Sequence, residues 1–315
     1  MLLTKGQQIN EFVIESDGPI GKGNFSLVYK STFQKKPAAL KICKLGIEAQ
    51  DIKRFHREND ILHGLLTHDG IIQPYTKIIE ENPACFYLME LATHGNLEEY
   101  INTNDLSDED KLSIFKKVCE AIRYAHEKKI VHRDLWWANI LMFLNKDSIS
   151  PKLTDFGRAK DFNIEDIVPY QPQTTPVKGY VVPPENFFKI WGTAELSKYV
   201  SSDMYALGVI LHFIYNVAPI TYIMLINASV TEFIQAQGYS FKDLLSRSNS
   251  MNMQLYEQWV KVFNFDIPKN HLTIQIKDRK ASEKINQIIL KLCHPDYRER
   301  YANVSLLLED IDSMQ

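Results

Sequence analysis

The sequence predicts an α+β chain in which a small, strand-rich N-terminal part precedes a larger, helical C-terminal part. Residues 10–45 alternate apolar and polar side chains around a pair of glycines, a pattern typical of strands joined by tight turns. After residues 94–96 the apolar positions recur at the spacing of one helix face. We expect a single domain over residues 1–315, with the strand-rich part covering about residues 10–90 and the helical part about residues 93–315.

Individual elements follow from the same patterns. Residues 51–66 have helical spacing, with the acidic Asp51 at the helix start. Strands are expected at 71–80 and 84–91, because Asn82-Pro83 turns the chain between them. The clearest helix covers residues 108–127, where acidic residues occupy the first turn. Its apolar face consists of Leu112, Phe115, Val118, Cys119, Ile122 and Ala125.

The composition is that of a globular protein. The 315 residues are 45% hydrophobic and 24% charged, and the formal net charge is -3, so no basic field favours a nucleic-acid partner. The four cysteines lie far apart among apolar neighbours, which favours buried, reduced thiols over a disulfide or zinc framework. They are Cys43, Cys85, Cys119 and Cys293.

The same features indicate a compartment. Reduced cysteines fit a reducing, cytoplasmic environment, and the opening MLLTKGQQINEF lacks the long apolar stretch of a signal peptide. Delivery into another cell stays open, because export signals that a receptor reads are too degenerate to recognise here.

One apolar segment, residues 204–226, is long enough to span a membrane. His212, Asn216 and Pro219 interrupt it, and no basic cluster flanks it to set an orientation. A helix that is apolar on all sides is equally suited to the buried axis of a large domain. We therefore expect a buried helix and no membrane span.

Two glycines in GKGNFSLVYK, residues 21–30, admit two interpretations. One is an ordinary hairpin turn. The other is a loop over phosphate oxygens, since Gly21 and Gly23 let backbone N–H groups approach a phosphate without a Cβ in the way. Taken alone the glycines favour the turn, because so short a motif arises easily by chance.

Two further motifs carry oxygen ligands. IVHRDLWWANIL, residues 130–141, holds Asp134 and, five positions later, Asn139, and LTDFG, residues 153–157, holds Asp155. An amide oxygen and a carboxylate near a second carboxylate form a hard-oxygen site suited to Mg²⁺. Because Mg²⁺ binds substrate phosphates, such a site implies a nucleotide partner.

These motifs together resemble those of the eukaryotic-type protein kinase family. The likeness runs in order from about residue 13 to residue 312, and six motifs in sequence make it specific. It implies an α+β, two-lobed protein kinase fold with a small β-rich N-lobe and a larger helical C-lobe. It also implies ATP-dependent phosphoryl transfer to a protein hydroxyl, with ATP and Mg²⁺ as cofactors and a protein as the substrate.

The resemblance gives roles to the charged residues. Lys41 of Ala39-Leu40-Lys41 is expected to contact the α- and β-phosphates below the glycine-rich loop, and Glu58 to pair with Lys41. Asp134 is expected to act as the catalytic base, while Asn139 and Asp155 hold Mg²⁺.

The resemblance also implies an adenine pocket. Backbone groups of Glu90 and Ala92 are expected to hydrogen-bond the adenine edge, with Met89 behind the ring. The apolar faces of this pocket are expected from Ile20, Val28, Ala39 and Leu141.

Scaffold positions of the family have counterparts as well. Glu185 is expected to form a buried ion pair with Arg300, and Asp203 to open the central buried helix. His132 and Phe156 are expected to pack rather than react. This scaffold favours a protein kinase over a small-molecule phosphotransferase with a similar nucleotide-binding plan.

Trp136 and Trp137 depart from the family pattern. Kinases that act on Ser/Thr usually carry a lysine two residues after the catalytic Asp, and an indole supplies no cation. This loss weakens stabilisation of the transition-state charge. Residues 174–185 are also irregular, and we hypothesise that Lys178 supplies the missing cation. Ser/Thr is the expected acceptor, with Tyr left open.

Phosphorylation of the chain itself is a further expectation. In the family, an arginine placed like Arg133 is often neutralised by a phosphate on the activation segment. Thr174, Thr175 and Tyr170 are the candidate acceptors, and ordinary surface hydroxyls are the equal alternative.

Two alternatives stay open. A pseudokinase that binds nucleotide without efficient transfer, and acts as a scaffold or allosteric partner, is favoured by Trp136 and disfavoured by the presence of all five polar site residues. Residues 218–285 match no motif; we interpret them as ordinary lobe packing, with a docking surface for a partner as the alternative.

Overall fold

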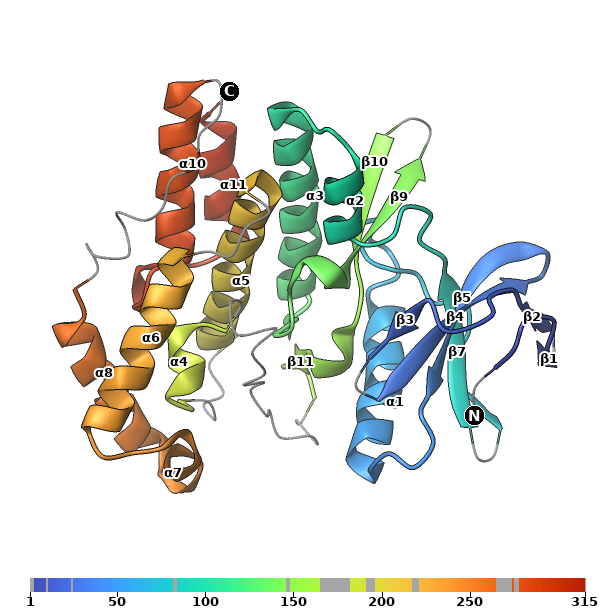
Figure 1. Ribbon diagram of the computed structural model, residues 1–315, viewed down its shortest axis with the longest axis horizontal. Coiled ribbons are helices and arrows are strands. Elements are labelled where there is room, and N and C mark those ends of the chain that lie inside the picture. The colour runs from blue at the N-terminus through green and yellow to red at the C-terminus, as the bar shows by residue number, and fades with distance from the viewer. Residues whose placement is uncertain are drawn as a thin grey trace.

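The computed structural model describes residues 3–9, 11–23, 25–81, 84–145, 148–164, 182–190, 196–216, 221–264, 274 and 278–314. Figure 1 shows one part built from a sheet with a single helix beside it and a second, larger part built mainly from helices. Short strand pairs lie where the two parts meet (Figure 1). The predicted α+β, two-lobed architecture is confirmed, and the two parts are called the N-lobe and the C-lobe below.

An antiparallel sheet of seven strands forms the N-lobe. Its order is β1-β2-β4-β5-β7-β6, and β3 pairs with β4. The longest pairing joins β4 to β5, from Ser26 opposite Cys43 to Phe33 opposite Lys36. The strands are β1 (Gln8–Ile9), β2 (Phe12–Ile14), β3 (Gly21–Lys22), β4 (Ser26–Phe33), β5 (Lys36–Cys43), β6 (Ile79–Glu81) and β7 (Ala84–Glu90).

Helix α1 (Ala49–Gly64) packs against this sheet and begins two residues before the predicted start at residue 51. Its buried side is apolar except for Glu58 and Asn59. Phe55 lies on Tyr87 of β7, with ring centroids 5.3 Å apart. The polar Glu58 is thereby carried to the sheet by the burial of its apolar neighbours.

The predicted strand at 71–80 is wrong over most of its length, because only residues 79–81 belong to the sheet. The preceding residues run between the lobes, where Ile72 donates its N–H to the carbonyl of Leu153. Pro74 lacks the N–H that a continuous ladder needs and makes only an isolated bridge. Apolar residues of this connecting segment, such as Ile72 and Pro74, are buried because it passes between the two lobes, so their pattern resembles that of a strand.

Helix α3 (Asp108–Glu127) has the bounds that the sequence predicts. Ser107 and Asp110 form a capping box at its start, each accepting the other's backbone N–H. The other helices are α2 (Leu97–Thr103), α4 (Pro184–Phe187), α5 (Leu196–Asn216), α6 (Thr221–Ala236), α7 (Phe241–Ser246), α8 (Asn249–Val262), α10 (Arg279–Leu292) and α11 (Val304–Asp312). The short strands of the C-lobe are β8 (Ile130–Val131), β9 (Ile140–Asn145), β10 (Ser148–Leu153) and β11 (Lys160–Asp161).

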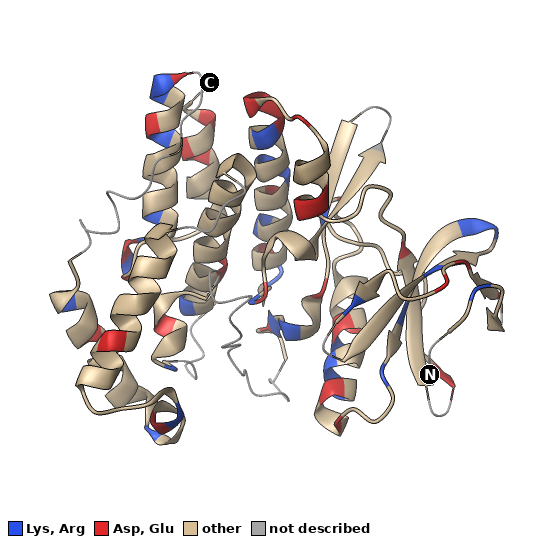
Figure 2. Ribbon diagram, viewed as in Figure 1, with Lys and Arg blue, Asp and Glu red and all other residues tan. Residues whose placement is uncertain are grey.

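The apolar segment 204–226 is divided between α5 and α6. Residues 199–214 of α5 are all buried, and Figure 2 shows α5 almost without charged residues. In the part of the chain that the structure describes, no helix has the length and apolar character needed to cross a membrane. The buried central helix is confirmed for residues 204–216, whereas residues 221–226 begin a second helix in which Thr221 and Met224 are exposed.

The four cysteines are buried and carry no disulfide, as predicted. Cys293 lies where α10 meets α5 at Gly208. A Cβ on Gly208 would lie 2.5 Å from Cys293 Sγ and 2.7 Å from Leu292 Cβ, which is too close for any side chain. The approach of these two helices therefore requires glycine at this position.

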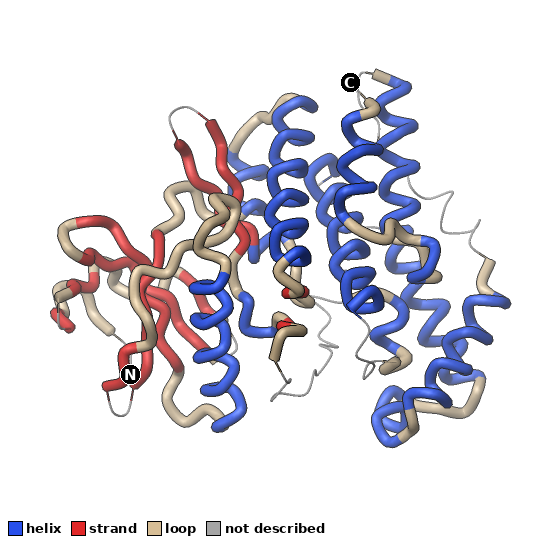
Figure 3. The backbone as a smooth tube through the Cα atoms, turned by 180° about the vertical axis from the view of Figure 1, so that it is seen from behind, coloured by secondary structure: helices blue, strands red, loops and turns tan. Residues whose placement is uncertain are grey.

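The region 218–285 forms α6, α7, α8 and the start of α10 where it is described. The apolar residues at 233–245 and 253–263 recur at helical spacing. A turn at Gly238, whose φ is 78°, divides the first of these stretches between α6 and α7, and the second falls almost wholly within α8. Figures 1 and 3 place α7 and α8 at the end of the molecule opposite the strands. A docking role for this region stays a prediction.

A buried ion pair ties α4 to the C-terminal end of the C-lobe, as the sequence predicts. Arg300 donates from Nη1 and Nη2 to the two carboxylate oxygens of Glu185, at 2.7 and 2.9 Å. Both side chains are at most 2% exposed. Arg300 also donates to the backbone carbonyls of Ser201 and His294. A buried pair of this kind is costly to break on one side only.

Replacing Glu185 with Gln should leave the guanidinium of Arg300 charged, buried and without its bidentate partner. We expect a loss of about 3–5 kcal/mol in the free energy of unfolding, measured by urea denaturation. As a control, Glu283→Gln breaks an exposed pair with Arg279 and should cost at most about 1 kcal/mol. Equal losses in the two variants would contradict the importance of this pair.

Candidate active site

A buried ion pair joins the sheet to helix α1. Lys41 of β5 points its ammonium at Glu58, and Nζ lies 2.6 Å from Oε1 and 2.8 Å from Oε2. The side chain of Lys41 is 7% exposed and that of Glu58 is fully buried. Burial alone would lower the pKa of Lys41, but the carboxylates of Asp155 and Glu58 outweigh it and raise this pKa well above its ordinary value. The ammonium is thus held in its charged form.

Asp155 is the second acidic partner of Lys41. Its Oδ1 lies 3.4 Å from Lys41 Nζ, and its side chain is 35% exposed, unlike that of Glu58. The backbone of Asp155 is left-handed, with φ 62° and ψ 59°, and leads directly into the short 3-10 helix η2 (Phe156–Arg158). This sharp turn leaves the carboxylate open to solvent beside a buried cation.

Gly157 permits a close approach between the two lobes. A Cβ on Gly157 would lie 3.1 Å from Cζ of Phe25, at the end of the glycine-rich segment, and 3.6 Å from Oε2 of Glu58. The loop between β3 and β4 therefore brings its aromatic side chain over the turn that carries Asp155. The glycine leaves room for both neighbours.

Asn139 lies in a short 3-10 helix, η1 (Trp137–Asn139), and is buried. Its Nδ2 donates to the backbone carbonyl of Asp134 at 2.8 Å, so Oδ1 is the end of the amide that is left to coordinate a metal. The N–H of Thr154 donates to the carbonyl of Asn139 at 3.0 Å. Because Thr154 precedes Asp155, this bond places the amide and the carboxylate on adjoining segments.

The donors on these two segments fit a hard cation. An amide oxygen and a carboxylate are oxygen ligands of the kind that Mg²⁺ takes, usually with waters and substrate phosphates completing its shell. Asn139 and Asp155 are the predicted ligands, and the backbone bond from Thr154 to Asn139 places them on adjoining segments.

Asp134 faces a cation that the sequence analysis did not assign. Arg158, the last residue of η2, places Nε 4.0 Å from Asp134 Oδ2, and both side chains are less than a fifth exposed. The sequence did indicate that Arg158 lies near the site, because Arg158 directly follows the Asp-Phe-Gly motif. Sequence alone did not reveal that η2 turns this side chain toward Asp134.

A fully buried carboxylate holds the segment that displays Asp134. Asp203 of α5 accepts the backbone N–H groups of His132 and Arg133, at 2.8 and 2.9 Å, and lies 2.9 Å from His126 Nε2. Burial would raise the pKa of Asp203, but the hydrogen bonds from His126 and the Arg133 backbone outweigh it and lower this pKa. With both N–H groups fixed, Arg133 takes a left-handed conformation, φ 61°, just before Asp134.

His132 and Phe156 pack, as expected. Both are fully buried, and their rings lie 4.6 Å apart. The ring of His132 also lies 3.0 Å from the carbonyl of Thr154 through Nε2. The two motif segments are therefore joined by side chains as well as by backbone.

The residues predicted around adenine lie on neighbouring segments, and the N–H of Ile20 donates to the carbonyl of Val28 at 2.7 Å. Val28, Ala39 and Leu141 belong to the same apolar cluster, and Ala39 lies directly opposite Met89 in the sheet. Ile20 is 54% exposed and lies outside that cluster.

The connection after β7 carries an ion pair that the sequence did not indicate. Glu90 pairs through its carboxylate with Lys152 Nζ of β10 at 2.6 Å, and its N–H donates to Gln73 O. Ala92 follows two residues later and is half-buried.

Several predictions fall on residues that the structure does not describe. They concern the turn at Asn82-Pro83, the candidate phosphorylation sites Tyr170, Thr174 and Thr175, and the cation at Lys178. The tryptophans are described. Trp137 stacks on Phe213 of α5 with ring centroids 4.3 Å apart, which gives it a packing role, and Trp136 lies next to it.

The fold and the charged groups at the lobe junction define a class of protein. Residues 14–310 match the protein kinase domain family, which is nearly the whole chain. The chain belongs to this family. The predicted resemblance to the protein kinase family is therefore confirmed.

Individual relatives have names that agree with this class. The chain is 33% identical over 150 residues to the probable serine/threonine-protein kinase fhkA of Dictyostelium discoideum, covering 45% of this chain and 25% of that protein. It is 30% identical over 169 residues to the serine/threonine-protein kinase PLK4 of Drosophila virilis, and this alignment covers 52% of this chain and 21% of that protein. It is 35% identical over 165 residues to the testis-specific serine/threonine-protein kinase 3 of Mus musculus, and this alignment covers 50% of this chain and 57% of that protein. The alignments thus span a quarter or less of the first two relatives.

Replacing Asp203 with Asn tests how far one buried carboxylate fixes the Asp134 segment. An amide has one acceptor oxygen instead of two, so a backbone N–H of His132 or Arg133 loses its partner. We expect the free energy of unfolding to fall by about 1–3 kcal/mol, measured by urea denaturation. Glu232→Gln, on the exposed side of α6, should change it by at most about 0.5 kcal/mol. An Asp203→Asn protein as stable as the control would show that this anchor is dispensable.

Proposed function

We propose that this chain transfers the γ-phosphoryl group of ATP to a serine or threonine hydroxyl of a protein. One observation carries the proposal: contacts bring together the segments that hold five polar residues scattered in the sequence. The side chains of Lys41, Glu58 and Asp155 form one connected group. The side chain of Asn139 bonds to the backbone carbonyl of Asp134, and the backbone bond from Thr154 to Asn139 joins this segment to the segment of Asp155. The names of the relatives support Ser/Thr as the acceptor.

The residues divide the work of phosphoryl transfer. Lys41, held charged by Glu58, binds the α- and β-phosphates of ATP and positions the chain of phosphates. Asn139 Oδ1 and the carboxylate of Asp155 would hold Mg²⁺, which neutralises phosphate charge when it is bound. Asp134 accepts the proton of the substrate hydroxyl as its oxygen bonds to the γ-phosphorus and the bond to the β-phosphate oxygen breaks.

Arg158 is proposed as the cation that Trp136 does not provide. Related kinases that act on Ser/Thr usually place a lysine at the position of Trp136. Here the guanidinium of Arg158 lies next to Asp134, in a site that is largely shielded from water. A cation so placed stabilises negative charge on the phosphoryl group as it is transferred. Lys178 stays a second hypothesis for the same role.

A pseudokinase is the alternative function, and Trp136 is the observation that favours it. Without a cation at the transferred phosphoryl group, nucleotide would bind but turn over slowly. The intact pair of Lys41 and Glu58, and the presence of Arg158 beside Asp134, favour transfer over this alternative.

The decisive measurement uses radiolabelled ATP with Mg²⁺ and generic protein acceptors. We expect label on serine or threonine, and we expect Asp134→Asn to lower the transfer rate about 100-fold or more while ATP binding persists, because only the general base is lost. An exposed carboxylate gives the control, since Asp105→Asn should leave the rate unchanged.

Four results would overturn parts of this proposal. Nucleotide binding without transfer by the unaltered chain would identify a pseudokinase. Label on small metabolites and none on protein would identify a small-molecule phosphotransferase. Full activity in Asp134→Asn would remove Asp134 as the base, and label confined to tyrosine would change the acceptor class.

Substitutions at Arg158 separate a role in the transition state from a role in nucleotide binding. Arg158→Gln should lower kcat about 100-fold with little change in KM for ATP, because the cation acts on developing charge. Arg158→Lys should restore part of kcat, which a purely structural role would not predict. Arg123→Gln, on the surface of α3, serves as the control. An unchanged kcat in Arg158→Gln would exclude this assignment.

A further inference from the structure

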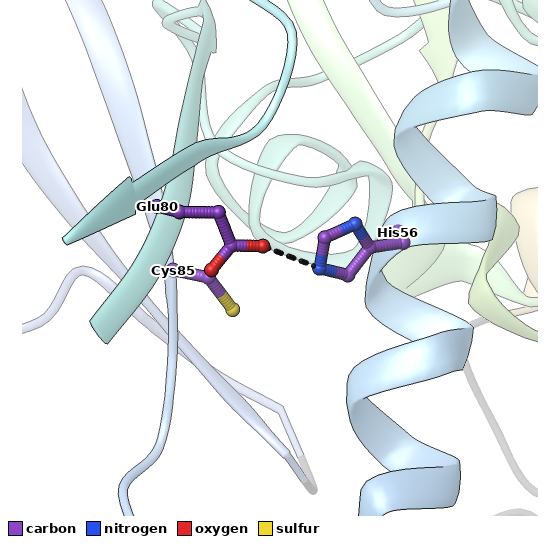
Figure 4. A group of neighbouring side chains, drawn as sticks. All are labelled: His56, Glu80 and Cys85. Atoms are coloured by element: carbon purple, nitrogen blue, oxygen red, sulfur yellow. Dashed lines mark ion pairs between the residues drawn. The ribbon is translucent and has the colours of Figure 1, made fainter. Parts of the chain in front are cut away.

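Three side chains of metal-binding types meet on the flank of the N-lobe, away from the residues assigned above. His56 comes from α1, Glu80 from β6 and Cys85 from β7, and their ligand atoms all lie within 4.8 Å of one another. Figure 4 shows the carboxylate of Glu80 directed at the ring of His56, with the sulfur of Cys85 beside it. His56 Nε2 lies 3.0 Å from Glu80 Oε1. The spacing of these residues in the sequence gave no sign of this meeting.

A second cysteine, Cys43, lies next to Cys85 on the neighbouring strand. Cys43 is the residue of β5 that follows the pairing of Ile42 with Phe86, which places it opposite Cys85 on the neighbouring strand. The two thiols are thus neighbours across the strand pair, and the S–H of Cys43 is a weak donor that can serve the sulfur of Cys85. Metal ligands are typically held by such outer hydrogen bonds, which orient the ligand and favour its charged form.

The access and the chemistry of the group suit a metal from solution. The side chains of His56 and Glu80 are 39% and 66% exposed, so an ion reaches them without unfolding the lobe. Cys85 lies at the buried side of the group. One thiolate, one imidazole and one carboxylate are ligands that zinc combines in four-coordinate sites.

We propose that His56 Nε2, Glu80 and Cys85 Sγ form a binding site for Zn²⁺, with water as the fourth ligand and Cys43 as the hydrogen-bond donor to Cys85. Zinc bonds of about 2.0–2.3 Å place tetrahedral ligand atoms about 3.3–3.7 Å apart. The three ligand atoms therefore need to close by at most about 1.5 Å from their present separations. Cys85 gives up its thiol proton to solvent when the metal binds.

Such a site would fasten α1 to the sheet. His56 lies two residues before Glu58 on α1, and Cys43, which lies opposite Cys85, follows Lys41 by two residues on β5. A metal that joins α1 to β6 and β7 therefore restrains both elements that supply the Lys41–Glu58 pair. The proposal does not rest on the phosphoryl-transfer assignment, since its evidence is the donor set alone.

Cobalt(II) provides a test that does not involve ATP. Bound to a thiolate, Co²⁺ shows a sulfur-to-metal charge-transfer absorption, and Zn²⁺ displaces it. We expect the full chain, reduced and free of metal, to develop this absorption with one equivalent of Co²⁺ and to lose it when Zn²⁺ is added. Cys85→Ser should abolish the absorption, and His56→Gln or Glu80→Gln should weaken Zn²⁺ affinity by at least about tenfold.

Matched controls come from the same elements. His63→Gln lies on α1, Glu81→Gln is the neighbour of Glu80 on β6, and Cys119→Ser replaces another buried thiol; all three should leave the absorption unchanged. The exposed positions of His56 and Glu80 keep the test decisive even if Cys85→Ser does not fold. No thiolate absorption in the unaltered chain, or equal loss of affinity in the control variants, would overturn the site.

Discussion

The geometry of the candidate active site depends on one buried carboxylate. A charge in the interior is tolerated only when donors surround it, and Asp203 finds them in two consecutive backbone N–H groups and a histidine ring. These bonds compel the chain to turn at Arg133 and to present Asp134 on the far side of the turn. Helix α5 thus does more than fill the core, because its buried Asp203 determines the backbone conformation of the segment that carries Asp134.

A second constraint acts between the lobes. Lys41 and Glu58 are both removed from water, so each depends on the other and on the packing of α1 against the sheet. A shift of α1 would take the buried Glu58 away from Lys41 and leave Lys41 with Asp155 as its acidic partner. Asp155 shares Lys41 with Glu58, and the position of α1 is therefore coupled to the turn that carries the predicted metal ligand.

Patterns with strong local signals were predictable from the sequence. The bounds of α3 follow from its apolar face and its capping residues, and the pair of Glu185 with Arg300 follows from the family motifs. Residues 71–80 were mistaken for a strand because burial between two lobes mimics alternation. The contacts of Arg158 and of Cys85 were not predictable, since each depends on a turn or a strand pairing that brings distant residues together. A pattern of neighbouring residues in the sequence does not reveal contacts between residues that lie far apart in the chain.

The contact between Phe25 and Gly157 has a consequence for which residues either position can accept. Gly157 follows Asp155 by two residues, and the ring of Phe25 comes within 3.1 Å of the place that a Cβ on Gly157 would take. Any larger residue at position 157 would have to push this ring aside. The two positions therefore constrain each other's substitution, although they belong to different lobes.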